Sequence, residues 1–164
     1  MANTQAMATS FKQDILNGIH AFGSSVVRAA TTKDTFKAAL YLTSASLGAA
    51  TTAYSSTGEV TGTGYTAGGN TVTTATAPTT SGTTAFFTPS ASIVFTSITL
   101  TTAFDAVLIY NDTAAGKNAV SIHTFGAQTV TAGTFTLSMP SNDSSNALIR
   151  VAWYVLNLIL VEYY

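Results

Sequence analysis

The strongest β-strand signal in this chain lies in residues 93–110, which read Ile93-Val-Phe-Thr-Ser-Ile-Thr-Leu-Thr-Thr-Ala-Phe-Asp-Ala-Val-Leu-Ile-Tyr110. The first part, residues 93–100, is a continuous apolar and β-branched run, which is typical of a strand buried on both faces. The last part, residues 104–110, alternates between two faces, one of which would carry Phe104, Ala106, Leu108 and Tyr110. We therefore expect two successive strands here.

Further short strands are expected on both sides of this region, separated by turn-forming segments. Residues 47–70 and 78–84 are rich in glycine, serine, threonine or proline and are interpreted as loops. The remaining expected strands lie at residues 36–42, near 59–63, and at 71–77, 120–125 and 134–139. About seven short strands at roughly 10-residue spacing predict an all-β protein, an antiparallel β-sandwich or a jelly-roll-like barrel.

One short helix is expected over residues 10–21, before the strands begin. Ser10 is suited to cap its first turn and Gly23 to end it, and the apolar residues at helical spacing are Phe11, Ile15, Leu16 and Ile19. A chain of 164 residues fits one domain with one core. We expect a single β-sandwich domain over residues 1–152 that includes this helix.

The C-terminal segment, residues 153–164, is interpreted as an apolar extension of that domain. Only 11 residues separate Arg150 from Glu162, and Asn157 interrupts them. Because a bilayer span needs about 20 apolar residues, no membrane helix is expected. The segment from residue 147 onward is apolar at odd and even positions alike, so a strand here must be covered on both faces.

Two arrangements would cover these residues. The segment could form a long central strand within the monomer. Alternatively, its end could be buried against a neighbouring subunit as an added strand or a packed arm, and we take this as the leading hypothesis. The subunit-contact residues would then be Trp153, Tyr154, Leu156, Leu158, Leu160, Tyr163 and Tyr164.

Charge and composition narrow the possible partners. Only 8% of the residues are charged, against about 25% in ordinary soluble domains, and threonine supplies roughly a fifth of the chain. The polar faces are thus mostly hydroxyl, which suits a permanent assembly. The six Lys and Arg residues are scattered and the net charge is −1, so no nucleic-acid partner is expected. The chain has no cysteine, hence no disulfide or thiolate site, and residues 1–10 carry no signal-peptide pattern.

A search for catalytic residues finds one arrangement to consider. Ser121 and His123 would be neighbours on one face of a strand, and Asp105 or Asp112 could approach from the next strand. No nucleophile elbow or oxyanion-loop signature accompanies them. The other histidine, His20, falls at the end of the predicted helix, where it suits the helix dipole. We predict no catalytic residues and no enzymatic activity.

Cofactor and metal sites are not expected either. The two histidines are about a hundred positions apart, which does not favour a zinc site. Four loop residues could offer oxygen ligands to calcium, but they are more typical of turns: Asn111, Asp112, Asn142 and Asp143. The glycine-rich residues 58–69 lack the Gly-Lys-Ser/Thr ending of a phosphate-binding loop.

Eight stretches of the chain form a pattern in consistent order, namely Ser10-Phe-Lys-Gln-Asp-Ile-Leu16, Asp34-Thr-Phe-Lys-Ala-Ala-Leu-Tyr41, Thr51-Thr-Ala-Tyr54, Gly58-Glu-Val60, Gly62-Thr-Gly-Tyr-Thr-Ala-Gly-Gly69, Leu108-Ile-Tyr-Asn111, Ala132-Gly-Thr-Phe-Thr-Leu137 and Asn146-Ala-Leu-Ile-Arg-Val-Ala152. Together they resemble a family of small virion proteins of tailed bacteriophages, of the marine and cyanobacterial type. Most members are structural or uncharacterised, so the resemblance implies a virion structural role and supplies no catalytic residues.

The chain departs from this family at two places. Relatives commonly carry an acidic, Trp-containing stretch where this chain has residues 95–104, which contain neither an acid nor Trp. Relatives also often end near Ala152, so residues 153–164 look like an extension specific to this chain. That is the segment for which a monomer has little room, which strengthens the hypothesis of a subunit-contact arm.

Three functions compete at this point. The leading one is a capsid decoration (cement) protein on the virion surface that clamps neighbouring major capsid subunits, as a homo-oligomeric trimer or dimer. The second is a tail, fibre or head-fibre component with a docking or receptor-binding role. The third is a carbohydrate-binding or hydrolytic module that uses His123 and exposed tyrosines, namely Tyr41, Tyr54 and Tyr65.

Overall fold

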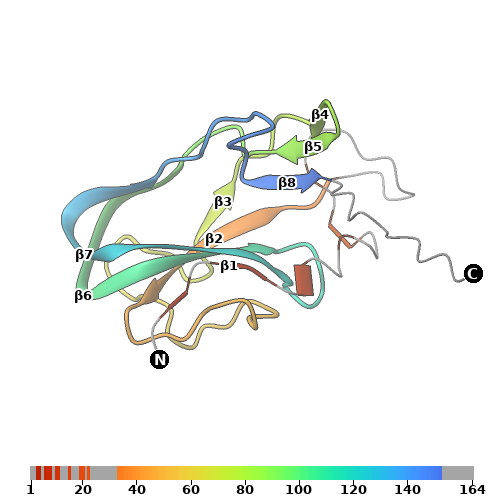
Figure 1. Ribbon diagram of the computed structural model, residues 1–164. Coiled ribbons are helices and arrows are strands. Elements are labelled where there is room, and N and C mark those ends of the chain that lie inside the picture. Colours follow the sequence, from red (N-terminus) through yellow and green to blue (C-terminus); the bar gives the residue numbers. More distant parts are fainter. Residues whose placement is uncertain are drawn as a thin grey trace, which may run out of the picture.

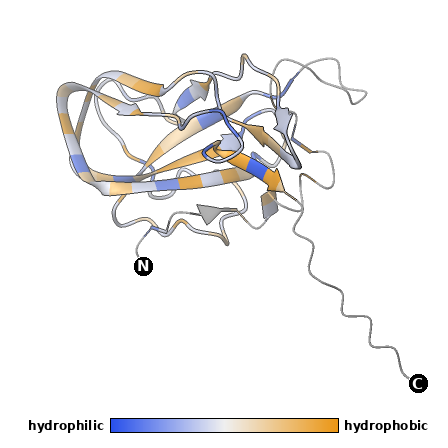
Figure 2. Cartoon of the chain, turned by 45° about the horizontal axis from the view of Figure 1, so that its top comes forward, coloured by the Kyte–Doolittle hydropathy of each residue, from blue (hydrophilic) through white to orange (hydrophobic). Residues whose placement is uncertain are grey.

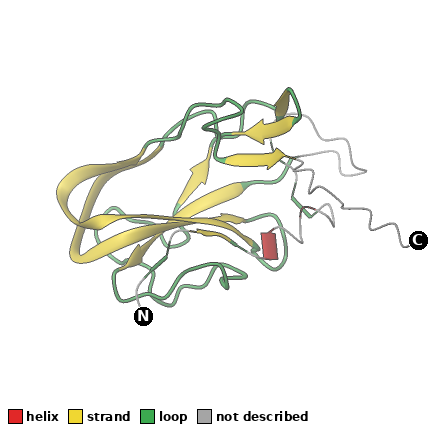
Figure 3. Cartoon of the chain, in the orientation of Figure 1, coloured by secondary structure: helices red, strands yellow, loops and turns green. Residues whose placement is uncertain are grey.

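The computed structural model describes residues 3–4, 6–8, 10–11, 15, 19–20, 22 and 33–152. These residues form mostly β-strands in two antiparallel sheets with almost no helix, which confirms the predicted all-β class (Figure 1, Figure 3). The larger sheet has the order β1-β7-β6-β2-β3 and the smaller one the order β4-β5-β8. The strands are β1 (Ala6–Met7), β2 (Phe36–Leu42), β3 (Asn70–Val72), β4 (Thr79–Ser81), β5 (Thr84–Phe87), β6 (Ile93–Asn111), β7 (Ala119–Leu137) and β8 (Ile149–Ala152).

The predicted helix over residues 10–21 lies mostly outside the described residues. Ser10, Phe11 and Ile15 are helical, and the helix as a whole stays a prediction. Phe11 is fully buried, and its ring lies 4.9 Å from that of His20 and 5.8 Å from that of Phe22. The described part of the N-terminal segment therefore contributes aromatic rings to the core.

Two long strands, β6 and β7, replace four of the short strands that we expected. Each has 19 residues, and together they form a hairpin that bends in its middle (Figure 1). The predicted connection at residues 126–133 is wrong, because this stretch continues the ladder with β6 through several register shifts. Ser97 and Ala132 adopt positive φ angles of 54° and 45° near these shifts. The irregular residues are absorbed as β-bulges, which bend both strands together.

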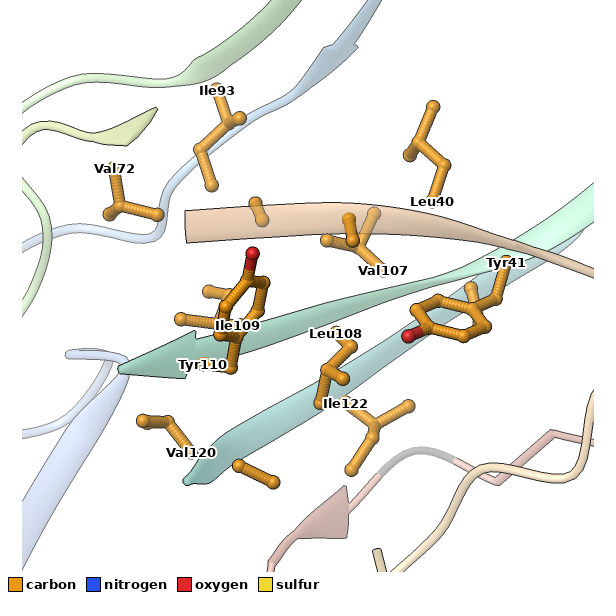
Figure 4. Packing of buried hydrophobic residues seen from close by; sticks show 14 of the residues in the cluster. Leu40, Tyr41, Val72, Ile93, Val107, Leu108, Ile109, Tyr110, Val120 and Ile122 are labelled. Carbon is orange, nitrogen blue, oxygen red and sulfur yellow. The ribbon is translucent and has the colours of Figure 1, made fainter. Parts of the chain in front are cut away.

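The core occupies both faces of the larger sheet where β2 pairs with the second half of β6. Figure 4 shows Leu40 and Val107 on one side of the sheet and Leu108 and Ile122 on the other, and all four are buried. The prediction that residues 93–100 are buried on both faces is wrong. Ile93 is buried but its neighbour Val94 is 41% exposed, so this half of β6 has one solvent face.

The smaller sheet contributes to the same core. Phe87 of β5 and Ile149 of β8 belong to the buried cluster that contains Phe36 of the larger sheet. Phe22 joins the two sheets, since its ring stacks on Phe36 at 4.5 Å and lies 5.3 Å from Phe87.

Residues 78–84, expected to be a loop, contain β4 and a turn at Gly82. Residues 153–164 lie outside the described residues, so the predicted arm is not tested.

The glycine-rich segment at residues 58–69 packs its backbone directly against neighbouring strands. Gly69 has a φ of 74°, and a Cβ at this position would collide with the carbonyl oxygen of Ala38 in β2. A Cβ at Gly62 would likewise collide with the carbonyl oxygen of Thr99 in β6. Glycine is required here because the loop covers strand backbones at a distance that no side chain allows.

Substitution of two glycines should separate this packing effect from backbone strain. Gly69→Ala should lower the free energy of unfolding by at least about 3 kcal/mol, because positive φ and a backbone collision act together. Gly82→Ala is the matched control, with a φ of 56° and no atom within 4 Å of the added Cβ. It should cost only about 1–2 kcal/mol. Urea denaturation measures both values, and equal losses would contradict the close packing of the loop.

Candidate functional site

The most organised polar site in the described part of the chain is a cluster built around Glu59. Its carboxylate accepts hydrogen bonds from the hydroxyl of Tyr54 (2.7 Å), the hydroxyl of Tyr65 (2.6 Å) and the amide of Gly68 (2.7 Å). Glu59 itself is 7% exposed. We call Tyr41, Tyr54, Glu59, Tyr65 and Tyr110 the tyrosine–glutamate cluster.

The other two tyrosines of the cluster tie the loop to the sheet. Tyr110 of β6 donates its hydroxyl to the carbonyl of Gly68 at 2.8 Å, and its ring stacks on Tyr54 at 4.6 Å. Tyr41 of β2 donates its hydroxyl to the carbonyl of Ser55. Each hydroxyl in the cluster thus has a partner on the loop, which leaves no unused donor to act on a ligand.

The cluster also completes the edge of β2. β3 pairs with β2 only from Phe36 to Ala38, so the rest of that edge needs other partners. The amide of Leu40 donates to the Tyr65 hydroxyl at 3.0 Å, and the amide of Val60 donates to the Leu40 carbonyl at 3.0 Å. The Tyr65 hydroxyl therefore takes the place of a strand carbonyl as acceptor, and it donates its own hydrogen bond to Glu59.

Burial governs the ionisation of the tyrosines. Burial, then the hydrogen bond to Glu59, raises the pKa of Tyr54 from 10.0 to about 12. The same two causes, burial first, raise the pKa of Tyr65 still further. Burial is also the main cause that raises the pKa of Tyr41 and of Tyr110. These hydroxyls stay protonated at neutral pH and act as hydrogen-bond donors.

The tyrosines predicted to be exposed are not free for a carbohydrate. Tyr41 is 1% exposed, which contradicts that prediction, and Tyr54 and Tyr65 are part-buried with their hydroxyls bound to Glu59. Sequence reasoning missed Glu59 altogether. The available signal was one acidic residue in a glycine-rich stretch, with a tyrosine five positions before it and another six positions after it.

Ser121 and His123 lie together on β7, as predicted. Ser121 Oγ and His123 Nε2 are 3.0 Å apart, and burial lowers the pKa of His123 below its usual 6.5. Neither predicted carboxylate joins them in the described structure. Asp105 accepts a hydrogen bond from the Asn3 side chain, and Asp112 binds Lys37 and Lys117. The pair is a hydrogen-bonded Ser–His contact without the third member of a triad.

Two of the four predicted turn formers, Asn111 and Asp143, bind loop amides. Asn111 Oδ1 accepts the amides of Thr113 (3.0 Å) and Ala114 (3.1 Å). Asp143 Oδ1 accepts the amides of Ser145 and Asn146, both at 2.8 Å. These two side chains therefore accept hydrogen bonds from the loop backbone, which confirms the turn interpretation for Asn111 and Asp143. Among the described residues, no group of three His, Asp or Glu side chains is placed to hold a metal ion.

A shallow surface hollow of about 350 Å³ lies where the 88–92 segment meets Met139 and Pro140. Its lining consists of threonine, serine, alanine, proline, methionine and asparagine side chains. It offers neither an ionisable group for catalysis nor an aromatic ring on which a sugar could stack.

The predicted subunit-contact residues Trp153, Tyr154, Leu156, Leu158, Leu160, Tyr163 and Tyr164 all lie outside the described residues. No helix in the described part of the chain is long and apolar enough to cross a bilayer. Comparison with known proteins finds no matching family model, no matching curated protein and no matching solved structure.

Replacing the buried carboxylate should destabilise the protein through specific partners. Glu59→Gln keeps the shape but turns one acceptor atom into a donor that faces a hydroxyl or amide donor. We expect a loss of about 2 kcal/mol in the free energy of unfolding. In the double variant Glu59→Gln/Tyr65→Phe, the loss should be smaller than the sum of the single losses, because both changes break one network. Strictly additive losses by urea denaturation would contradict the network.

Above pH 10 the free energy of unfolding should fall more steeply than in a protein whose folded-state tyrosines have ordinary pKa values. The folded-state pKa of each cluster tyrosine lies above its unfolded value of 10.0, so the stability is intact below pH 10 and is lost as pH rises above it. Each tyrosine that ionises only in the unfolded chain should cost roughly 1.4 kcal/mol per pH unit. Urea midpoints between pH 8 and 11.5 measure the slope, and Tyr54→Phe should reduce it. A flat profile to pH 11.5 would refute the assignment.

Proposed function

We propose that this protein is a structural protein of a bacteriophage particle, and that it works by assembling with other proteins rather than by catalysis. The form we favour is a capsid decoration (cement) protein that clamps neighbouring major capsid subunits. As part of this proposal, the two sheets constitute a β-sandwich or jelly-roll-like barrel. Its expected partners are the major capsid protein or other virion proteins and further copies of itself, as a trimer or dimer.

The observation that carries the proposal is the uncharged surface of the bent half of the long β6–β7 hairpin, whose one acidic residue, Asp105, is half-buried. The exposed residues of β7 lie between Gly126 and Thr136, and none is ionisable. Figure 2 shows apolar and polar bands alternating along this hairpin without a large hydrophilic stretch. A surface of hydroxyls and small apolar groups lacks the charge that keeps monomers apart, so it supports a role in lasting protein contacts.

The polar chemistry of the described residues supports the same proposal. The Glu59 carboxylate is buried and already accepts three hydrogen bonds, and Asp112 is held by two lysines. The Ser121–His123 contact lacks a carboxylate partner among these residues. Polar groups that bind one another stabilise a rigid unit, which is what a clamp in a particle requires. The resemblance to small phage virion proteins adds the particle as the place of action.

Position on the particle separates decoration from the alternative, a tail, fibre or head-fibre component. Decoration relies on many equivalent weak contacts, so its binding strength grows with copy number through multivalency. A tail or fibre component acts at few sites and relies on docking or receptor contacts.

Quantitative gels of purified particles should show copies on the order of hundreds, because a capsid lattice repeats its joints by symmetry. Particles that lack the protein should lose infectivity at lower temperature than complete particles, and adding the purified protein back should restore resistance. A few copies per particle would end the cement proposal in favour of the tail component. Absence from the particle would overturn the virion role altogether.

A further inference from the structure

The outer edge of β7 is the longest unpaired strand edge in the described structure. β1 pairs with β7 only at Ser121 and Ile122. From residue 123 to Leu137, no described strand lies on that side of β7. The terminal strands of the two sheets, by contrast, are only two to four residues long. Short edge strands are a common protection against unwanted pairing, and β7 lacks it.

This edge also presents aromatic rings. The rings of Phe125 and Phe135 lie 5.0 Å apart, and that of Phe135 lies 5.2 Å from the ring of the buried Phe104. Phe125, Val130, Phe135 and Leu137 pack on the core but remain partly exposed. Residues 123–137 contain no Lys, Arg, Asp, Glu or Pro that would deter an incoming strand.

The other open position is the end of β8. Ala152 pairs with Thr84, which is the first residue of β5, and the turn at Gly82 lies just beyond. A strand that continues past Ala152 therefore runs out of partners in its own sheet within about two residues. The chain has 12 more residues, which are apolar at both parities and include a single charged side chain, Glu162. These residues need a partner from elsewhere.

We propose that residues 153–164 of one copy add as a strand to the outer edge of β7, residues 123–137, in a second copy. Twelve extended residues span roughly 40 Å, enough to follow most of this edge. Apolar side chains at alternate positions would cover Phe125 and Phe135, while the backbone would satisfy the open edge.

The placement of the two elements favours a second copy over the same chain. β8 lies at one end of the molecule and the bend of β6 and β7 at the other (Figure 1). An arm from one copy to the edge of the next is a head-to-tail contact, which closes into a ring such as a trimer when the rotation permits. This inference rests on the proposed assembly role and names the contact that performs it.

Charge placed on the edge should prevent assembly without disturbing the fold. Thr129 and Thr134 are exposed on β7, and Thr57 is an exposed threonine in a distant turn. By light scattering after gel filtration, we expect an oligomer for the full chain and for Thr57→Lys. The Thr129→Lys/Thr134→Lys variant should be a monomer that keeps the far-UV circular dichroism spectrum of the full chain. A monomeric full chain would overturn the inference, as would an edge variant that still assembles while deletion of 153–164 gives a monomer.

A disulfide trap tests the contact directly, since the natural chain has no cysteine. A tagged chain with Leu158→Cys, mixed with an untagged chain with Thr134→Cys, should form a mixed disulfide under mild oxidation. Thr57→Cys in place of Thr134→Cys should not. Absence of the mixed disulfide would refute the docking site even where copy counts in particles support the virion role, so the two proposals fail separately.

Discussion

The buried carboxylate of Glu59 is the interaction on which the rest of this structure depends. A carboxylate removed from water is costly unless its oxygens are satisfied, and here two tyrosine hydroxyls and the Gly68 amide satisfy them. No described Lys or Arg forms an ion pair with it, so neutral donors supply the whole compensation. Because these donors sit on the loop before β3, the carboxylate holds the loop, and the loop completes the β2 edge through Leu40 and Val60.

The attachment of this loop to the sheet also accounts for the glycines and for the bent hairpin. With Tyr65 acting as the acceptor for Leu40, the loop must approach β2 and β6 more closely than any Cβ permits, as at Gly69 and Gly62. The first half of β6 receives the loop through the Thr63–Thr99 bridge, and its partner β7 bends with it through the shifts between Gln128 and Gly133. The loop thus covers the sheet on the side of β2 and β6, whereas on the opposite side no described strand pairs with β7 from residue 123 to Leu137.

The sequence could predict where strands lie. It could not predict how far each strand continues or which distant residues meet in the folded chain. The strand expected at residues 104–110 lies within β6, and the one expected at residues 134–139 overlaps the end of β7, which stops at Leu137. The expected strands at residues 93–100 and 104–110 are one strand, β6, and a register shift lies between Leu100 and Phe104 where we expected a break. The sequence did not identify Glu59 as a site residue. Its role depends on Tyr54, Tyr65 and Gly68 converging in space, which periodicity cannot show. Ser121 and His123 were found because a two-residue spacing on a strand fixes their contact.

The outer edge of β7 and the chain beyond β8 are complementary, because each has what the other lacks. This is the strongest reason to treat them together. The β7 edge carries partly exposed aromatic rings and no Lys, Arg, Asp or Glu, and from residue 123 to Leu137 no described strand pairs with it. Beyond Ala152 the sequence continues with apolar residues suited to a strand, and β5, which begins at Thr84, offers them no further pairing positions. Only 8% of the residues are charged, so electrostatic repulsion between copies is weak. It would do little to keep either feature from associating with a neighbour. The proposed pairing would cover both at once, and because β8 and the bend of β6 and β7 lie at opposite ends of the molecule (Figure 1), it would link copies rather than close a monomer.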